Sequence, residues 1–247
     1  MEKKELKKFV LGKLELRDGM RVLDLGCGNG GDLLALGERL HDASFYGVDA
    51  SAAGIAEAEA AAAGDGRFRF AAMDISAGLP FEDGVFDAVY SINLLECIVD
   101  KAALLRDIHR VLKPGGQTVM AHLDFDTQLF DGTDKDRVRR LVQAYSDWQQ
   151  AWMDDCDAWM GRRLWKHLNG SGLFEGAVEA FVLTDTRFEP GYYGYERAMD
   201  FGAMAKRGLV AEADYAAFLA EQHALGEAGQ FFYSITMYAY AGRKKGG

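Results

Sequence analysis

The sequence of 247 residues has few cysteines, few prolines and no long hydrophobic run. Its three cysteines, Cys27, Cys97 and Cys156, stand at unrelated spacings, so they predict neither a disulfide framework nor a metal site. No apolar segment approaches the roughly 18–20 residues that cross a bilayer, and the charged N-terminus is not followed by a signal-peptide core. We therefore expect a protein of the reducing cytoplasm without a membrane partner.

Basic side chains are also in short supply. The chain has 28 Lys and Arg against 38 Asp and Glu, which gives a formal net charge of −10. Non-specific binding to nucleic acid depends on Lys and Arg side chains that neutralise phosphates, and no basic patch stands out in the sequence. We therefore expect no nucleic-acid partner, and the charge is compatible with a small neutral or cationic molecule as substrate. The chain is expected to act on a small-molecule substrate as a monomer or a homodimer.

The most informative segment is residues 22–30, which read Val-Leu-Asp-Leu-Gly-Cys-Gly-Asn-Gly. An apolar strand runs here into a glycine-rich turn, and a helix follows. Glycines allow the backbone to approach a ligand closely because no Cβ intervenes, and the first turn of the helix offers unpaired N–H groups. This pattern predicts a pocket for a nucleotide-like cofactor.

The glycines alone do not decide which cofactor binds. Gly26, Gly28 and Gly31 match the dinucleotide fingerprint G-x-G-x-x-G, which is a weak signal by itself. Gly26, Gly28 and Gly30, two residues after Asp24, equally match D-x-G-x-G-x-G. The rest of the chain has to resolve this ambiguity.

Strands and helices alternate regularly after the turn. This order predicts an α/β fold with a doubly wound, mostly parallel sheet, in a single domain 1–247. Residues 10–123 are expected to form the cofactor-binding core, and segments 124–172 and 187–229 a helical cap with the substrate insertions. The predicted strands are 20–25, 44–49, 68–74, 85–91, 117–123, 178–186 and 231–241, and the predicted helices lie within 1–19, 31–40, 51–63, 100–112, 135–168 and 195–228.

Polar residues stand at the carboxyl ends of these strands. Asp49, Asp74, Asn93 and His122 each end or follow a predicted strand. Doubly wound sheets bind ligands beyond the carboxyl ends of their strands, so these side chains should converge on the glycine turn.

The order of these motifs resembles the class I S-adenosylmethionine (SAM) dependent methyltransferases. The resemblance rests on segment 22–30, Asp49, Asp74, segment 86–91 and the turn 111–116, and it is strong over residues 10–123. The chain looks most similar to the ubiquinone/menaquinone-methyltransferase-like group, which acts on small molecules. The resemblance implies a Rossmann-like, seven-stranded sheet with an antiparallel last strand. It implies methyl transfer from SAM to a nitrogen, oxygen or carbon atom, with S-adenosyl-L-homocysteine as product.

The resemblance also implies roles for single residues. Asp24 would anchor the turn, Asp49 would accept both ribose hydroxyls, and Asp74 would accept from the adenine amino group. The alternatives are that Asp49 caps a helix, that Asp74 caps a turn, and that Cys27 only packs. The implied cofactor-binding residues are Asp24, Gly26, Cys27, Gly28, Gly30, Asp49, Ala50, Asp74, Ile75, Ser91, Ile92 and Asn93.

Methyl transfer depends mainly on orientation and a dry site, so no catalytic triad is expected. His122 is the first candidate for a weak base, because its ordinary pKa lies near neutrality; the alternative is a strand-end residue that shapes the pocket. Strand alternation places Asp124 on the same side as His122. The candidate substrate-binding residues are Asp126, Trp152, Tyr193, Tyr195, Phe231 and Tyr233.

Two further segments are assigned an expected structure. The acidic residues Asp154, Asp155 and Asp157 are expected on a solvated helix face, and the glycine- and tyrosine-rich segment 191–195 as a loop over the active site.

The competing functions are an NAD(P)-dependent oxidoreductase and a non-catalytic SAM-binding scaffold. A DNA amino-methyltransferase is disfavoured, because Ser91, Ile92, Asn93 and Leu94 stand where such enzymes carry Asp/Asn-Pro-Pro-Tyr.

Overall fold

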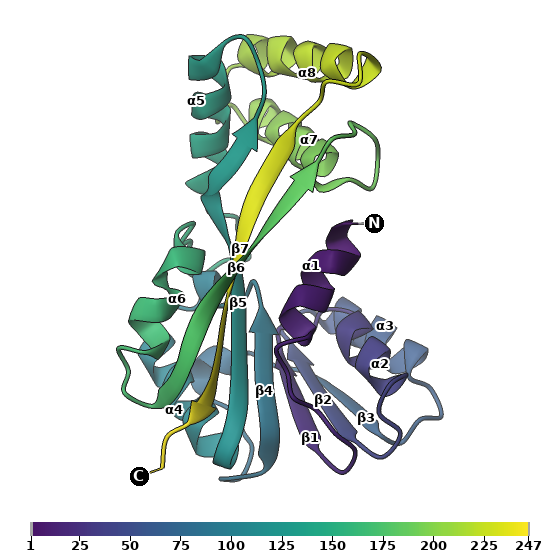
Figure 1. Cartoon of the computed structure of the whole chain (residues 1–247), viewed down its shortest axis with the longest axis vertical. Helices are drawn as coiled ribbons and strands as arrows, with labels where there is room; N and C mark the ends of the chain where they lie inside the picture. Colours follow the sequence, from purple (N-terminus) through teal and green to yellow (C-terminus); the bar gives the residue numbers. More distant parts are fainter. Residues whose placement is uncertain (1, 247) are drawn as a thin grey trace.

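The computed structural model describes residues 2–246, and Figure 1 shows the arrangement of its elements. The strands are β1 (Arg21–Leu25), β2 (Ser44–Asp49), β3 (Phe68–Ala72), β4 (Phe86–Ile92), β5 (Leu112–Phe130), β6 (Phe174–Asp185) and β7 (Tyr233–Lys244). The helices are α1 (Glu2–Leu11), α2 (Gly31–Gly37), α3 (Ala52–Ala61), α4 (Lys101–Val111), α5 (Lys135–Ser146), α6 (Met160–Leu168), α7 (Tyr193–Lys206) and α8 (Glu212–Glu227), with short 3-10 helices η1 (Ile75–Ala77) and η2 (Leu95–Cys97).

All seven strands belong to one sheet, in the order β3-β2-β1-β4-β5-β7-β6. The first five strands are parallel, and β7 runs antiparallel to both of its neighbours. Asp24 of β1 lies opposite Gly47 of β2 and Tyr90 of β4. The predicted fold class, including the antiparallel last strand, is confirmed.

Alternate residues of the central strands enter two separate cores. Val22 and Ala88 belong to a core that includes α1 and α2, whereas their neighbours Leu23 and Val89 belong to a core with α4 and α6. Figure 1 shows α1, α2 and α3 on one side of the sheet and α4 and α6 on the other. Because successive side chains of a strand point to opposite faces, continuous apolar strands suit a sheet that helices cover on both sides.

Three long strands continue beyond the parallel part of the sheet. The register between β5 and β7 shifts between Asp124 and Leu129, and the strands then extend towards α5, α7 and α8. These helices form the cap, whose core is aromatic: Phe130 contacts Phe218 and Tyr233 with ring centroids 5.2 and 4.6 Å apart. The helical cap is thus built on the protruding ends of β5, β6 and β7 (Figure 1).

Several predicted elements have different bounds in the structure. The helix predicted over 135–168 is divided into α5 and α6, and α6 packs on the sheet beside α4 rather than within the cap. The predicted helix over 195–228 is interrupted between α7 and α8. The helix predicted within 1–19 is α1, and Met1 and Gly247 lie outside the described residues.

The loop expected over 191–195 is also corrected, because α7 begins at Tyr193. The Asp185 carboxylate accepts the backbone N–H of Gly194 at 2.7 Å, so it satisfies one of the free donors of the first helical turn. A Cβ at Gly194 would lie 2.7 Å from Tyr233 Cβ. This glycine therefore permits close packing of the helix on β7 rather than a loop.

Candidate active site

A cavity of about 310 Å³ lies at the carboxyl ends of β1, β2, β3 and β4. Its size is at the lower end of the range of about 300–1,000 Å³ that is typical of small-molecule sites. It is lined by Gly26, Val48, Asp49, Ala50, Met73, Asp74, Ile75, Ile92, Asn93, Leu94, Cys97, Ile98, Trp152 and Asp154. Seven of the twelve residues predicted to bind the cofactor line this cavity.

The glycine turn forms one wall of the cavity. Gly26 and Gly30 adopt φ angles of 78° and 72°, which L-residues with a side chain rarely adopt. A Cβ on Gly30 would lie 2.8 Å from the Phe70 ring and 2.9 Å from Ala58, so the turn also needs glycine for packing. Gly28 and Gly30 thus shape the turn without lining the cavity.

Asp49 connects the end of β2 to this turn. Its two carboxylate oxygens accept the backbone N–H groups of Gly28 and Ser51, each at 2.8 Å. The N-cap of α3 is Ser51, whose hydroxyl accepts from Gly54 N. A carboxylate offers about four acceptor positions, so two remain for further donors in the cavity.

Asp74 follows β3 and faces the same cavity. It is also the N-cap of η1, where its carboxylate accepts the backbone N–H of Ser76 at 2.8 Å. Hydrogen bonds from the Ser76 hydroxyl and N–H lower the pKa of Asp74, so the group is ionised at neutral pH. Asp74 therefore both caps the turn and faces the cavity.

Asn93 and Ser91 fix the end of β4. Asn93 has a φ of 57°, and its Oδ1 accepts the backbone N–H of Leu123 at 2.9 Å. Asn is one of the few non-glycine residues that adopts this backbone conformation readily. The buried Ser91 hydroxyl donates to the carbonyl of Leu25 at 2.8 Å, which ties β4 to β1 behind the cavity.

Asp24 and Cys27 are buried and do not line the cavity. The Tyr90 hydroxyl donates to Asp24 Oδ2 at 2.8 Å, and burial raises the pKa of Asp24 to about 8. Burial likewise raises the pKa of the Cys27 thiol to about 12, which suits a packing residue rather than a nucleophile.

The connection between α5 and α6 supplies residues that the sequence did not assign to the cofactor. Trp152, predicted to bind substrate, lines the cavity of about 310 Å³ together with Asp154. The acidic cluster 154–157 is not on a helix, which corrects that expectation. Asp155 pairs with Lys101 at 2.8 Å, and Asp157 pairs with Arg163 at 2.7 Å. No periodic pattern marks such an irregular segment.

His122 lies at the end of the parallel part of β5 and is fully buried. Its Nδ1 is 2.7 Å from the carbonyl of Leu123, which fixes the proton on Nδ1 and leaves Nε2 as an acceptor. Burial lowers the pKa of His122 to about 4, so the ring is neutral at pH 7. Nε2 lies 3.6 Å from Oε1 of Glu96, a buried residue that no sequence motif marked as functional.

Asp124 faces the same side as His122, as strand alternation predicts, but its carboxylate is engaged. Arg162 of α6 donates Nη2 to Asp124 Oδ1 at 2.6 Å and Nε to Oδ2, a bidentate pair in which Asp124 is fully buried. Gly161 makes this contact possible, since a Cβ there would lie 2.9 Å from the His122 carbonyl oxygen. The geometry favours a structural role for Asp124.

The predicted substrate-binding aromatics are distributed through the cap. Phe231 and Tyr233 are buried in its core, and Tyr195 packs on Phe188 with ring centroids 5.0 Å apart. Tyr193 instead lies beside a buried arginine of α7, Arg197, whose guanidinium is 5.3 Å from the centre of its ring.

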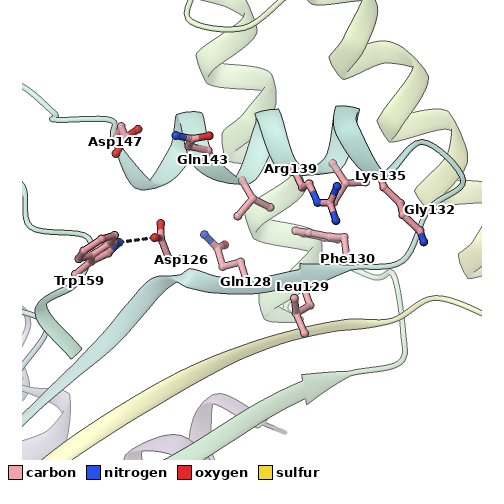
Figure 2. A pocket seen from close by; sticks show the side chains of 12 residues that line it. Asp126, Gln128, Leu129, Phe130, Gly132, Lys135, Arg139, Gln143, Asp147 and Trp159 are labelled. Atoms are coloured by element: carbon pink, nitrogen blue, oxygen red, sulfur yellow. Dashed lines mark hydrogen bonds between the residues drawn. The ribbon is translucent and has the colours of Figure 1, made fainter. Parts of the chain in front are cut away.

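A second cavity, of about 560 Å³, lies between α5 and β5 and is shown in Figure 2. Asp126 is at one end of it, where its carboxylate accepts the indole N–H of Trp159. Lys135 and Arg139 are at the other end (Figure 2). The predicted substrate residue Asp126 is therefore in a different cavity from Asp49 and Asp74.

Within residues 2–246, no group of three or more His, Cys, Asp or Glu side chains is arranged to hold a metal ion. No described helix is both long and apolar enough to span a membrane.

The strand order and the cavity at the carboxyl ends define a Rossmann-like methyltransferase fold. A family model described as a methyltransferase domain matches residues 16–185. The chain belongs to this family, within the class I SAM-dependent methyltransferases, and SAM is the cofactor of this class.

Individual relatives agree with this assignment. The sterol 4-C-methyltransferase strm-1 of Caenorhabditis elegans is 33% identical over 148 residues, which span 56% of this chain and 41% of that protein. An arsenite methyltransferase of Aquipseudomonas alcaligenes is 33% identical over 132 residues, which span 50% and 38%. The match thus covers about two-fifths of these relatives. The structure of YcgJ from Bacillus subtilis has the same fold, with a TM-score of 0.64, 19% identity, and coverage of 99% of this chain and 100% of that one.

Proposed function

We propose that the protein transfers the methyl group of SAM to a nitrogen, oxygen or carbon atom of a small molecule, and that the cavity of about 310 Å³ holds the cofactor. The observation that carries the proposal is the joint presence of Asp49, Asp74 and the glycine turn at one cavity. Carboxylates at this position suit the hydroxyls of a ribose and the amino group of an adenine, both of which are donors.

The chain's own residues fit the cofactor in three ways. Asp49 keeps two acceptor positions after it has bound Gly28 N and Ser51 N. Gly26 brings its backbone to the cavity wall without a Cβ, so a ligand can approach the chain closely. The apolar side chains of Ile75 and Ile92 complete the walls; Ile75 would lie at the adenine end, and Ile92 would help to exclude water from the methyl group.

SAM supplies the methyl group and its leaving group, so the protein's contribution is to bind, orient and desolvate the reactants. The acceptor's nucleophilic atom must approach the methyl carbon from the side opposite the sulfur. Asn93 and Leu94 line the cavity, and Asn93 is hydrogen-bonded to Leu123, the neighbour of His122, so we assign the acceptor to this side, beneath the cap.

The NAD(P)-dependent oxidoreductase is not supported, because the family match and Asp74 at the cavity favour SAM. The non-catalytic scaffold differs from the enzyme only in turnover, since both bind SAM.

Isothermal titration calorimetry with SAM and with S-adenosylhomocysteine tests the cofactor assignment. We expect both molecules to bind, and NADH not to bind; failure of both at millimolar concentration would reject the proposal. Turnover is tested with methyl-labelled SAM and a small-molecule extract of cells. Labelled product excludes the scaffold, whereas binding without any label in a broad metabolite pool favours it.

A further inference from the structure

Glu96 is a buried acid beside the cofactor cavity that the proposed function does not yet use. It belongs to η2, with 6% of its surface exposed. Cys97 of η2 and Leu94, the N-cap of η2, line the cavity. Glu96 is therefore adjacent in the chain to residues of the cavity wall, and its carboxyl lies beside His122 at the end of the parallel part of β5.

Within the described residues, few charged or polar groups offset the cost of burying the ionised Glu96 carboxylate. One titratable neighbour is His122 of β5, whose Nε2 is 3.6 Å from Oε1 and has no hydrogen-bond partner among the described residues. Burial raises the pKa of Glu96 to about 8. Arg197 of α7 and Lys101 of α4 oppose this rise, and Asp157, ahead of α6, adds to it.

The two cations near Glu96 already have carboxylate partners. Lys101 donates to Asp155 at 2.8 Å, and Arg197 donates to Asp200 at 2.8 Å. The Arg197 guanidinium also lies over the Tyr145 ring, 4.1 Å from its centre. Neither cation forms an ion pair with Glu96, so no cation of the described residues neutralises this carboxyl directly.

We propose that Glu96 is the catalytic residue that accepts the proton of the methyl acceptor, and that His122 is a positioning residue that holds the Glu96 carboxyl at the cavity wall. This inference rests on the proposed function. It also reassigns the base: the buried, neutral ring of His122 donates Nδ1–H to the Leu123 carbonyl, so its Nε2 faces Glu96, where it can accept a hydrogen bond from the protonated carboxyl.

The step balances for an acceptor with an O–H or N–H group. The acceptor atom forms a bond to the methyl carbon as the carbon–sulfur bond breaks, and the electron pair of that bond stays on sulfur. The acceptor proton passes to the Glu96 carboxylate, which later releases it to solvent. Glu96 must therefore be ionised when the methyl donor is bound.

The requirement that Glu96 is ionised when SAM is bound can be tested without a known acceptor, because binding of a cation is linked to proton release from a nearby acid. The sulfonium of SAM is a cation and the sulfur of S-adenosylhomocysteine is neutral, while the two molecules share their amino-acid and nucleoside groups. A cation beside a protonated buried acid lowers its pKa, so binding SAM should expel a proton that binding S-adenosylhomocysteine does not. Asp24 could also release a proton on contact with the amino-acid or nucleoside groups. Both molecules carry these groups, so such a proton cancels when the release on S-adenosylhomocysteine binding is subtracted from that on SAM binding.

The experiment is calorimetry at pH 7 in buffers of different ionisation enthalpy, which counts the protons released. For wild type we expect SAM to release about half a proton or more per molecule beyond S-adenosylhomocysteine. Glu96→Gln should bind both molecules and lose this difference. Glu82→Gln, the same change on an exposed side chain, should retain it. When the titrations are repeated over a series of pH values, the difference in proton release between SAM and S-adenosylhomocysteine has a half-maximal pH. His122→Asn should lower this pH, because Nε2 no longer stabilises the protonated Glu96 carboxyl.

The outcomes separate the two proposals. If neither molecule binds, the proposed function and this inference are both rejected. If both bind and wild type shows no difference, or if the difference persists in Glu96→Gln, only the inference is overturned. The catalytic role is tested with methyl-labelled SAM and the cell extract: Glu96→Gln should reduce labelled product about 100-fold or more, and Glu82→Gln should not. Equal labelling by wild type and Glu96→Gln would contradict the role.

Discussion

The bidentate pair between Asp124 and Arg162 gives a prediction that separates a structural from a catalytic role. Asp124 is fully buried, and the guanidinium of Arg162 contacts both of its carboxylate oxygens. Arg162→Met keeps much of the side-chain volume and removes both donors. The carboxylate then retains only the backbone N–H of residue 162, at 3.3 Å.

The expected magnitude follows from this burial. Breaking a buried pair by removing one partner costs about 3–5 kcal/mol of unfolding free energy. The Arg162 side chain is 40% exposed, so solvent weakens the ion pair and can partly solvate the carboxylate when the guanidinium is removed. We therefore expect Arg162→Met to lower the free energy of unfolding by about 2–3 kcal/mol. The Asp124→Asn/Arg162→Met double variant should lose less than Arg162→Met alone, because no buried charge is left unpaired.

Urea unfolding followed by circular dichroism measures these differences, and methyl transfer with the cell extract measures activity in parallel. An Arg162→Met protein within about 0.5 kcal/mol of wild type would refute the structural reasoning. The same reasoning fails if Asp124→Asn abolishes methyl transfer while stability and SAM affinity are unchanged, since that result defines a catalytic group.

Three further predictions concern residues of the site and its support. Asp49→Asn should weaken SAM binding about 100-fold in calorimetry, through the loss of charge-assisted hydrogen bonds worth about 2–3 kcal/mol, and unchanged affinity would contradict the ribose assignment. Because burial lowers the pKa of His122 from 6.5 to about 4, its contribution to stability is present above pH 6.5 and lost as pH falls through 4. The loss amounts to about 3 kcal/mol, and unfolding curves at several pH values should show a flatter acid limb for His122→Asn. Gly161→Ala should destabilise the protein by about 1–3 kcal/mol, because its Cβ would lie 3.0 Å from Asp124 N; a neutral effect on the urea midpoint would show that α6 shifts freely.

The sheet and half of the residues that line the cavity of about 310 Å³ were predictable from the sequence. Buried strands and glycine turns are local signals, and the carboxyl ends of parallel strands meet at one edge of the sheet. Asp49, Asp74 and Asn93 could therefore be placed together before any contact was known. Asp24 shows the limit of this reasoning, because its side chain is satisfied by Tyr90 from a neighbouring strand.

The cap and the acceptor side were less predictable because they depend on tertiary contacts. Trp152 lines the cavity of about 310 Å³ from an irregular segment that carries no periodicity. Glu96 lies in an apolar stretch, and only its position beside His122 shows that its carboxyl is buried near another titratable group. The sequence signal that was available is an acid three residues after Asn93, in the segment that follows β4.

The most direct test of the central claim is a crystal structure with S-adenosylhomocysteine. We predict that the ribose hydroxyls lie within hydrogen-bond distance of the Asp49 carboxylate, with the adenine amino group beside Asp74 and the sulfur facing the segment from Ile92 to Leu94. Density for the molecule in the cavity between α5 and β5, or a ribose bound away from Asp49, would contradict the account.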